Sequence, residues 1–163
     1  MNIRTLWPSD REIEQEFVRG LSAQTRYYRF HSGVRELSPA MLERFINVNY
    51  PDEMALAATI EVDDREVLIG VARYMREPGK ETAEMAIVVA DAWQAKGIGT
   101  RLLLDLRSCA IAAGVKRMNA TVLSENRRMY ELAKRLGYEV EPRHGDYRTV
   151  ELGKEFDRVS YKK

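Results

Sequence analysis

One segment near the middle of the chain constrains the fold more than any other. It begins with Thr82–Val89, which is apolar on both faces after Glu84, as expected of a strand inside a sheet. It ends with Gly97–Ala113, in which apolar residues recur every three or four positions, and Gly114 follows where a left-handed terminating residue belongs. A buried strand that leads through a short turn into a strong amphipathic helix predicts an α/β fold.

The turn between this strand and this helix has the composition of an anion site. The first N–H groups of a helix have no partner within the helix, and together with the helix dipole they attract anions. Glycines at positions 97 and 99 leave room for a phosphate to approach the backbone. The alternative interpretation is two glycines that ease a tight turn. We predict that successive backbone amides hold a pyrophosphate without a metal, namely those of Gln94, Ala95, Lys96, Gly97, Ile98, Gly99 and Thr100.

The rest of the sequence predicts a single domain, residues 1–163, with a mixed sheet flanked by helices. No repeat, low-complexity tract or linker divides the chain. After a helical opening, the order is strand, strand, strand, helix, strand, helix, strand. The other strands are expected at Ile3–Leu6, Glu53–Val62, Val67–Tyr74, Arg117–Val122, Tyr138–Val140 and Thr149–Leu152. The other helices are expected at Asp10–Gly20, Ser22–Tyr28, Ser38–Ile46 and Asn126–Leu136.

Composition argues against several classes of function. The 26 basic and 25 acidic residues are spread along the chain, which favours neither nucleic acid nor a membrane surface as partner. The longest strongly apolar stretch, Met85–Ala90, is too short to cross a bilayer, and the amino terminus lacks the apolar core of a signal peptide. Cys109 is the only cysteine and His31 and His144 are the only histidines, so we expect no internal disulfide and no Cys/His metal site. These features predict a cytoplasmic protein.

Two motifs in the right order resemble the GNAT superfamily of N-acetyltransferases. Gln94–Gly99 resembles its acetyl-CoA signature, Gln/Arg-x-x-Gly-x-Gly/Ala, between a strand and a long helix. Asn126 followed eleven residues later by Gly137-Tyr138 resembles its second motif. The resemblance implies acetyl-CoA as cosubstrate and transfer to a primary amine by direct attack in a ternary complex. It also implies a GNAT fold, with a mixed, largely antiparallel sheet whose fourth and fifth strands run parallel and splay to admit the pantetheine arm.

A narrower resemblance concerns the acceptor. Tyr27–Phe30, Val34–Leu42 and Glu53–Leu56 resemble the acetyltransferase portion of bacterial protein-lysine acetyltransferases. This favours a protein lysine as the amine. Two alternatives stay open: an enzyme for a small amine such as a polyamine, amino acid or drug, and a catalytically silent acyl-CoA-binding module that regulates a partner. The sequence does not define an oligomeric state.

The reaction requires a base, and Glu84 is the candidate. A lysine amine has a pKa of about 10.4 and is almost entirely protonated at neutral pH, so a proton must be removed before attack. Glu84 begins a strand and shares a face with Ala86 and Val88. It also resembles the glutamate that many family members place at the start of this strand. The alternative is an edge carboxylate that meets solvent or an arginine such as Arg73.

The remaining roles follow from the resemblance. It implies that backbone amides near Val88 and Val89 hold the acetyl carbonyl and the pantetheine arm, and that Asn126 contacts the pantetheine; Asn126 can equally be a helix cap. Many members place a proton-donating tyrosine where this chain has Ala133. Tyr130 lies one turn earlier and is the candidate acid, although core packing is the role its spacing favours. Cys109 lies mid-helix on the apolar face, where a buried, inert thiol is expected.

Overall fold

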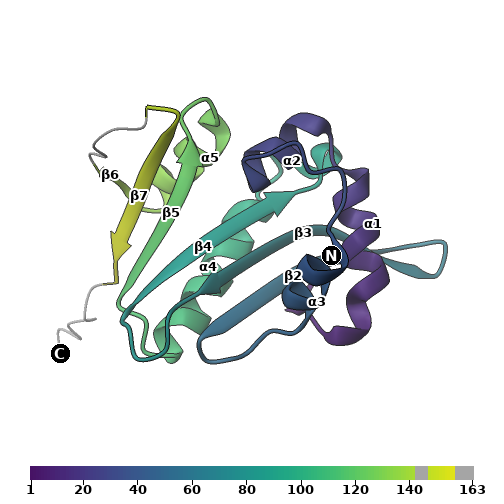
Figure 1. Cartoon of the computed structure of the whole chain (residues 1–163), viewed down its shortest axis with the longest axis horizontal. Coiled ribbons are helices and arrows are strands. Elements are labelled where there is room, and N and C mark those ends of the chain that lie inside the picture. Colours follow the sequence, from purple (N-terminus) through teal and green to yellow (C-terminus); the bar gives the residue numbers. More distant parts are fainter. Residues whose placement is uncertain (142–146, 157–163) are drawn as a thin grey trace.

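The computed structural model describes residues 1–141 and 147–156, and within them the chain forms one seven-stranded sheet flanked by five α-helices (Figure 1). His144 lies outside the described residues. The strand order across the sheet is β1-β2-β3-β4-β5-β7-β6. All neighbouring strands are antiparallel except β4 and β5, which run parallel. The strands are β1 Asn2–Thr5, β2 Glu53–Val62, β3 Arg65–Met75, β4 Thr82–Val89, β5 Arg117–Leu123, β6 Glu139–Glu141 and β7 Thr149–Glu155.

Helices cover both faces of the sheet and enclose two hydrophobic cores. On one face, α4 and α5 pack against the sheet through residues such as Leu102, Leu106 and Ala133. On the other face, α1 and α3 bury residues such as Phe17 and Ile46. No helix among the described residues is long and apolar enough to cross a membrane. The helices are α1 Arg11–Gly20, α2 Ala23–Phe30, α3 Pro39–Ile46, α4 Ile98–Ala112 and α5 Arg127–Arg135.

The helix cap and the helix-terminating glycines occur at the positions that the sequence predicts. The Ser38 side chain accepts a hydrogen bond from the Met41 backbone N–H and caps α3. Gly114 and Gly137, with φ of +85° and +88°, follow the ends of α4 and α5 in the left-handed conformation. The expected hairpin of β2 and β3 is present, but β3 begins two residues before and ends one residue after the predicted Val67–Tyr74, because the added residues also pair with β2.

The sheet opens between β4 and β5. The two strands pair only at their first residues, where Thr82, Ala83 and Glu84 lie beside Arg117, Met118 and Asn119. Beyond Glu84 they diverge, and Figure 1 shows the separation widening toward the end of β4 that leads to α4. The predicted splay of parallel fourth and fifth strands is therefore confirmed. It leaves one edge of the second half of β4 without a strand partner among the described residues.

Candidate active site

The turn after β4 adopts the conformation needed to bring successive amides together. Ala95 has φ of +59° and Gly97 has φ of +85°, so left-handed residues alternate with ordinary ones just before α4. Such an alternation points consecutive N–H groups toward one point and forms an anion-binding nest. Ile98 is buried and fixes the turn to the core. The Lys96 ammonium lies 5.1 Å from the centre of the Trp93 ring, so its side chain is drawn toward that ring.

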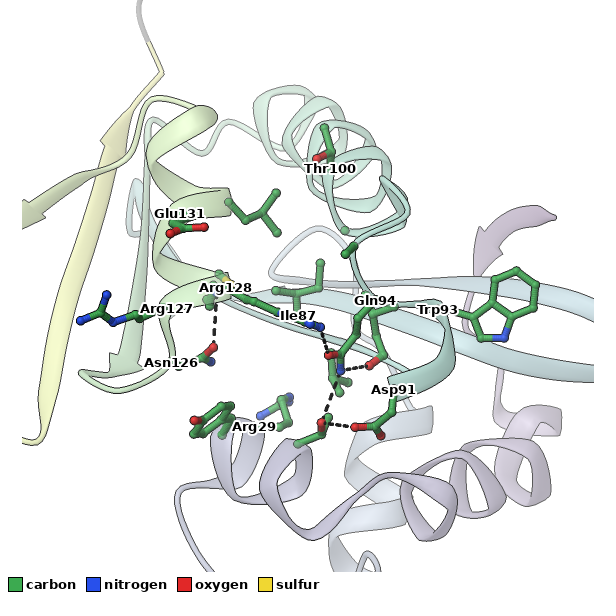
Figure 2. Close-up of a pocket in the computed structure, with 18 of the residues that line it drawn as sticks. Arg29, Ile87, Asp91, Trp93, Gln94, Thr100, Asn126, Arg127, Arg128 and Glu131 are labelled. Atoms are coloured by element: carbon green, nitrogen blue, oxygen red, sulfur yellow. Dashed lines mark hydrogen bonds between the residues drawn. The ribbon is translucent and has the colours of Figure 1, made fainter.

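A cavity of about 890 Å³ opens beside this turn (Figure 2). It is bounded by the turn, by the second half of β4, by α2 and by the start of α5. Lys96 and Ile98 are absent from its lining, because the Lys96 side chain turns toward Trp93 and the Ile98 side chain enters the core. The prediction for these two residues concerns their backbone amides. The predicted cosubstrate residues that line it are Val88, Val89, Gln94, Ala95, Gly97, Gly99, Thr100 and Asn126.

Gly99 keeps the cavity open on its inner side. A Cβ at this position would lie 3.0 Å from Leu132 Cδ2 and 3.7 Å from Ile87 Cδ1. Leu132 belongs to α5 and Ile87 to β4, and both line the cavity. Because Gly99 has no side chain, the space between α4, α5 and β4 stays open. This space lies where the sheet has opened.

The free edge of β4 presents backbone amides to this space. The N–H of Ala90 donates to Ile69 O at 2.8 Å, so Ala90 faces β3. In an antiparallel pair, alternate residues point their N–H and C=O groups to opposite edges. Val88 therefore also faces β3, whereas the N–H groups of Ile87 and Val89 point into the cleft. For the carbonyl-binding amides expected near Val88 and Val89, this geometry favours Ile87 and Val89.

A hydrogen-bond network ties α2 to the turn. Gln94 Nε2 donates to Val89 O at 3.0 Å and to Thr25 Oγ1 at 3.3 Å, while Gln94 Oε1 accepts from Arg128 at 2.7 Å (Figure 2). The Asp91 carboxylate accepts from Ser22 N, Ser22 Oγ and Thr25 Oγ1 at 2.9, 2.7 and 2.7 Å. Removal from solvent opposes ionisation of Asp91, but these donors prevail and lower its pKa. The sequence interpretation missed this role of Asp91, because no local pattern marks it.

Both ends of α5 add positive charge to the same cavity. The Asn126 side chain accepts from Met129 N at 3.3 Å and caps the helix, while still lining the cavity. Arg127, Arg128 and Arg135 also line it. Arg101, by contrast, lines neither cavity and lies 3.6 Å from Asp105. The cavity therefore combines a backbone nest with a cluster of guanidinium groups, which suits a ligand with several phosphates.

A second cavity, of about 930 Å³, adjoins the first along β4. Its lining includes Glu84, Met85 and Ala86, the residues of β4 that directly precede the stretch lining the first cavity. Glu84 is exposed, and its Oε1 accepts from Thr121 Oγ1 of β5 at 3.3 Å. The two cavities therefore follow each other along β4, with the candidate base in the second and the nest in the first.

Two other sequence candidates lie apart from the cavities. Tyr130 packs against the core, its ring centre lies 5.5 Å from the Lys134 ammonium, and it lines neither cavity. Cys109 packs against the same core, and burial raises the pKa of its thiol. Among the described residues, no group of three or more His, Cys, Asp or Glu side chains is arranged to hold a metal ion.

Comparison with known protein sequences identifies relatives of this chain. Residues 16–138 match the family described as the acetyltransferase (GNAT) family. An acetyltransferase of Pseudomonas aeruginosa is 32% identical over 136 residues, which cover 83% of this chain and 73% of the relative. The acetyltransferase Pat of Mycolicibacterium smegmatis is 36% identical over 136 residues, and this chain spans 40% of its length.

Solved structures share the fold. The GNAT domain of S. lividans PAT matches with a TM-score of 0.88 at 28% identity, over 94% of this chain and 89% of that domain. A phosphinothricin acetyltransferase from Sinorhizobium meliloti, solved in complex with acetyl-CoA, matches with a TM-score of 0.76 at 19% identity, over 99% of this chain and 91% of the other. At that lower identity the likeness concerns the fold alone.

Proposed function

The chain belongs to the acetyltransferase (GNAT) family, whose members use acetyl-CoA, and we propose that it transfers the acetyl group to a lysine amine of a protein by direct attack in a ternary complex. One observation carries this proposal. The cavity with the nest and the cavity with Glu84 are contiguous along β4, at the point where β4 and β5 separate. Two substrates can therefore reach the same short stretch of strand from two adjoining cavities.

Each substrate has a matching set of groups. The nest at 94–100 and the arginines of α5 suit the phosphates of acetyl-CoA, and the opening beside β4 suits its pantetheine arm. The N–H groups of Ile87 and Val89 are placed to donate to the thioester carbonyl oxygen, where negative charge develops during attack. The amine enters from the second cavity, and Glu84 takes its proton directly or through water. The carbon–sulfur bond then breaks, and the CoA thiolate leaves and takes up a proton.

Direct attack is supported by the position of Cys109. An acetyl-cysteine intermediate requires a thiolate beside both substrates. Cys109 lies on α4, lines neither cavity, and has a thiol whose pKa is raised by burial. Transfer through this thiol is therefore disfavoured by both its position and its ionisation.

A protein acceptor is supported by the surface beside Glu84. Within the described residues, no helix covers the face of β5 and β7 that carries Thr121 and Glu151 (Figure 1). By strand alternation, five glutamates and one arginine share this face, which therefore attracts cationic segments such as lysine-bearing loops. The narrower sequence resemblance to protein-lysine acetyltransferases favours the same acceptor. The charged residues of the face are Glu84, Glu139, Glu141, Glu151, Glu155 and Arg117.

The proposal is tested by thiol release from acetyl-CoA with proteins, lysine peptides and small amines as acceptors. Glu84→Gln keeps the size of the side chain but removes the base, so turnover should fall about 10²-fold or more at pH 7 with acetyl-CoA affinity nearly unchanged. The matched control is Glu81→Gln, which removes a carboxylate paired with Lys116 outside both cavities and should keep wild-type turnover.

Raising the pH distinguishes a lost base from a distorted site. Below the pKa of the amine, its neutral fraction increases about tenfold for each pH unit. Turnover of Glu84→Gln should therefore rise between pH 7 and pH 9 more steeply than that of the wild type. Normal turnover of Glu84→Gln at pH 7 would place the base elsewhere, and acetylation of small amines but of no protein would exclude the protein acceptor.

A further inference from the structure

Arg29 is a cation without an anionic partner at the junction of the two cavities. It projects from α2 into the first cavity (Figure 2) and also lines the second. Within residues 1–141 and 147–156, no carboxylate and no hydrogen-bond acceptor lies within bonding distance of its guanidinium. Its contacts are aromatic: the guanidinium carbon lies 5.0 Å from the centre of the Phe30 ring and 5.6 Å from that of Phe45.

The Glu14 carboxyl, which acts electrostatically on Arg29, is paired with a different arginine. Glu14 is buried and lies 3.5 Å from Arg73, which also donates to Phe45 O at 3.1 Å. The Arg73 guanidinium carbon lies 4.2 Å from the centre of the Phe45 ring, a ring that Arg29 also contacts. Burial, and then the positive charge of Arg73, lower the pKa of Arg29 to about 10. Arg29 thus stays charged at neutral pH in a place that disfavours charge.

We propose that Arg29 is a specificity-determining residue that receives a carboxylate of the acceptor lying close in space to the amine that is acetylated. This inference rests on the proposed function, because it concerns the second substrate of the same transfer. In the protein acceptor the carboxylate belongs to an aspartate or glutamate beside the acceptor lysine.

The chemistry of the guanidinium points to a carboxylate. Its planar fork of N–H donors matches the two oxygens of a carboxylate, and a charged acceptor offsets the cost of the desolvated cation better than a neutral one. Glu84 supplies the opposite charge in the same cavity. His31 also lines this cavity, where burial and then Arg29 lower its pKa while Glu84 opposes the shift. The cavity therefore presents an anion for the amine and a cation for a neighbouring acid.

Peptides that differ in one charge test the proposal. Lysine peptides with glutamate at −1 or +1 are compared with the same peptides carrying glutamine. The wild type should prefer the glutamate peptides by about tenfold or more in kcat/KM, as expected for a charge-assisted pair. Arg29→Gln should abolish the preference, and Arg29→Lys should restore part of it. Arg26→Gln removes a cation from the same helix outside both cavities and should keep the full preference.

Two further measurements show which carboxylate occupies the subsite and whether the preference arises in binding or in turnover. Free lysine, compared with lysine amide, reports whether the carboxylate of the amino acid itself can occupy the subsite. Calorimetric binding of the peptides in the presence of CoA reads the subsite without catalysis, and thermal denaturation shows that the variants are folded.

The outcomes distinguish this inference from the proposed function. Equal rates for glutamate and glutamine peptides in the wild type would refute the subsite while leaving the lysine acceptor intact. An equal loss for all acceptors in Arg29→Gln would assign Arg29 to the thioester and would also refute it. Arg29-dependent acetylation of free lysine, with no acetylation of peptides, would support the subsite and exclude the protein acceptor.

Discussion

Replacing Gly97 with alanine isolates the contribution of the nest to cosubstrate binding. Gly97 has φ of +85°, and a Cβ there would meet nothing within 4 Å, so the substitution adds backbone strain without a clash. Holding a non-glycine residue in this conformation costs about 1–2 kcal/mol. Gly97 is exposed, so the free turn can relax and its amides then no longer converge. Binding must restore the strained turn, which predicts about 5- to 30-fold weaker acetyl-CoA binding.

Gly79 provides the matched control for this prediction. It has φ of +80°, also has open space around a Cβ, and lies between β3 and β4 outside the lining of either cavity. Calorimetry and thermal denaturation are measured for both alanine variants. Gly79→Ala should keep wild-type affinity for acetyl-CoA. Gly97→Asn should lose less affinity than Gly97→Ala, because asparagine tolerates the left-handed region. If Gly97→Ala binds acetyl-CoA as tightly as the wild type, the nest does not hold the pyrophosphate.

Two other predictions concern residues around the site. Tyr130→Phe should leave turnover unchanged. Tyr130→Ala should lower the free energy of unfolding by about 2 kcal/mol or more, because the ring packs against the core. A large rate loss in the phenylalanine variant at unchanged melting temperature would instead make Tyr130 the acid. Asp91→Asn should destabilise the chain near neutral pH by weakening the anchor of α2. The folded pKa of Asp91 lies below its unfolded value, so this stabilisation is present above about pH 4 and is lost as the pH falls through the folded pKa. Urea denaturation should therefore show that the difference in free energy of unfolding between wild type and variant becomes smaller below about pH 4. A difference that does not change down to about pH 3 would contradict the assigned role.

The fold and the turn could be predicted because their signals are local. The periodicity of α4 and the apolar stretch of β4 lie within single elements, and glycine at 97 and 114 occupies left-handed positions in the structure. The Asn126 cap is likewise formed with a residue three positions away. Such patterns depend on neighbours in the sequence, so one sequence is enough to recognise them.

The contribution of α2 could not be predicted, because it depends on distant contacts. Ser22 and Asp91 are 69 residues apart in the sequence, as are Thr25 and Gln94. Arg29 lies in a helix whose sequence gives no sign that the neighbouring carboxylate is used by another arginine. Only the packing of α2 beside the end of β4 brings these residues to the cavities.

The opening between β4 and β5 has a consequence for the folded state itself. The half of the sheet formed by β5, β7 and β6 is joined to the other half by strand pairing at one end only. If acetyl-CoA binds in this opening as proposed, it would lie where a strand is missing and would contact both halves. A ligand that binds only the folded state, present at a hundred times its Kd, adds about 2.7 kcal/mol to the free energy of unfolding. The proposed site therefore predicts that the free energy of unfolding, and not only the turnover, increases with the concentration of acetyl-CoA.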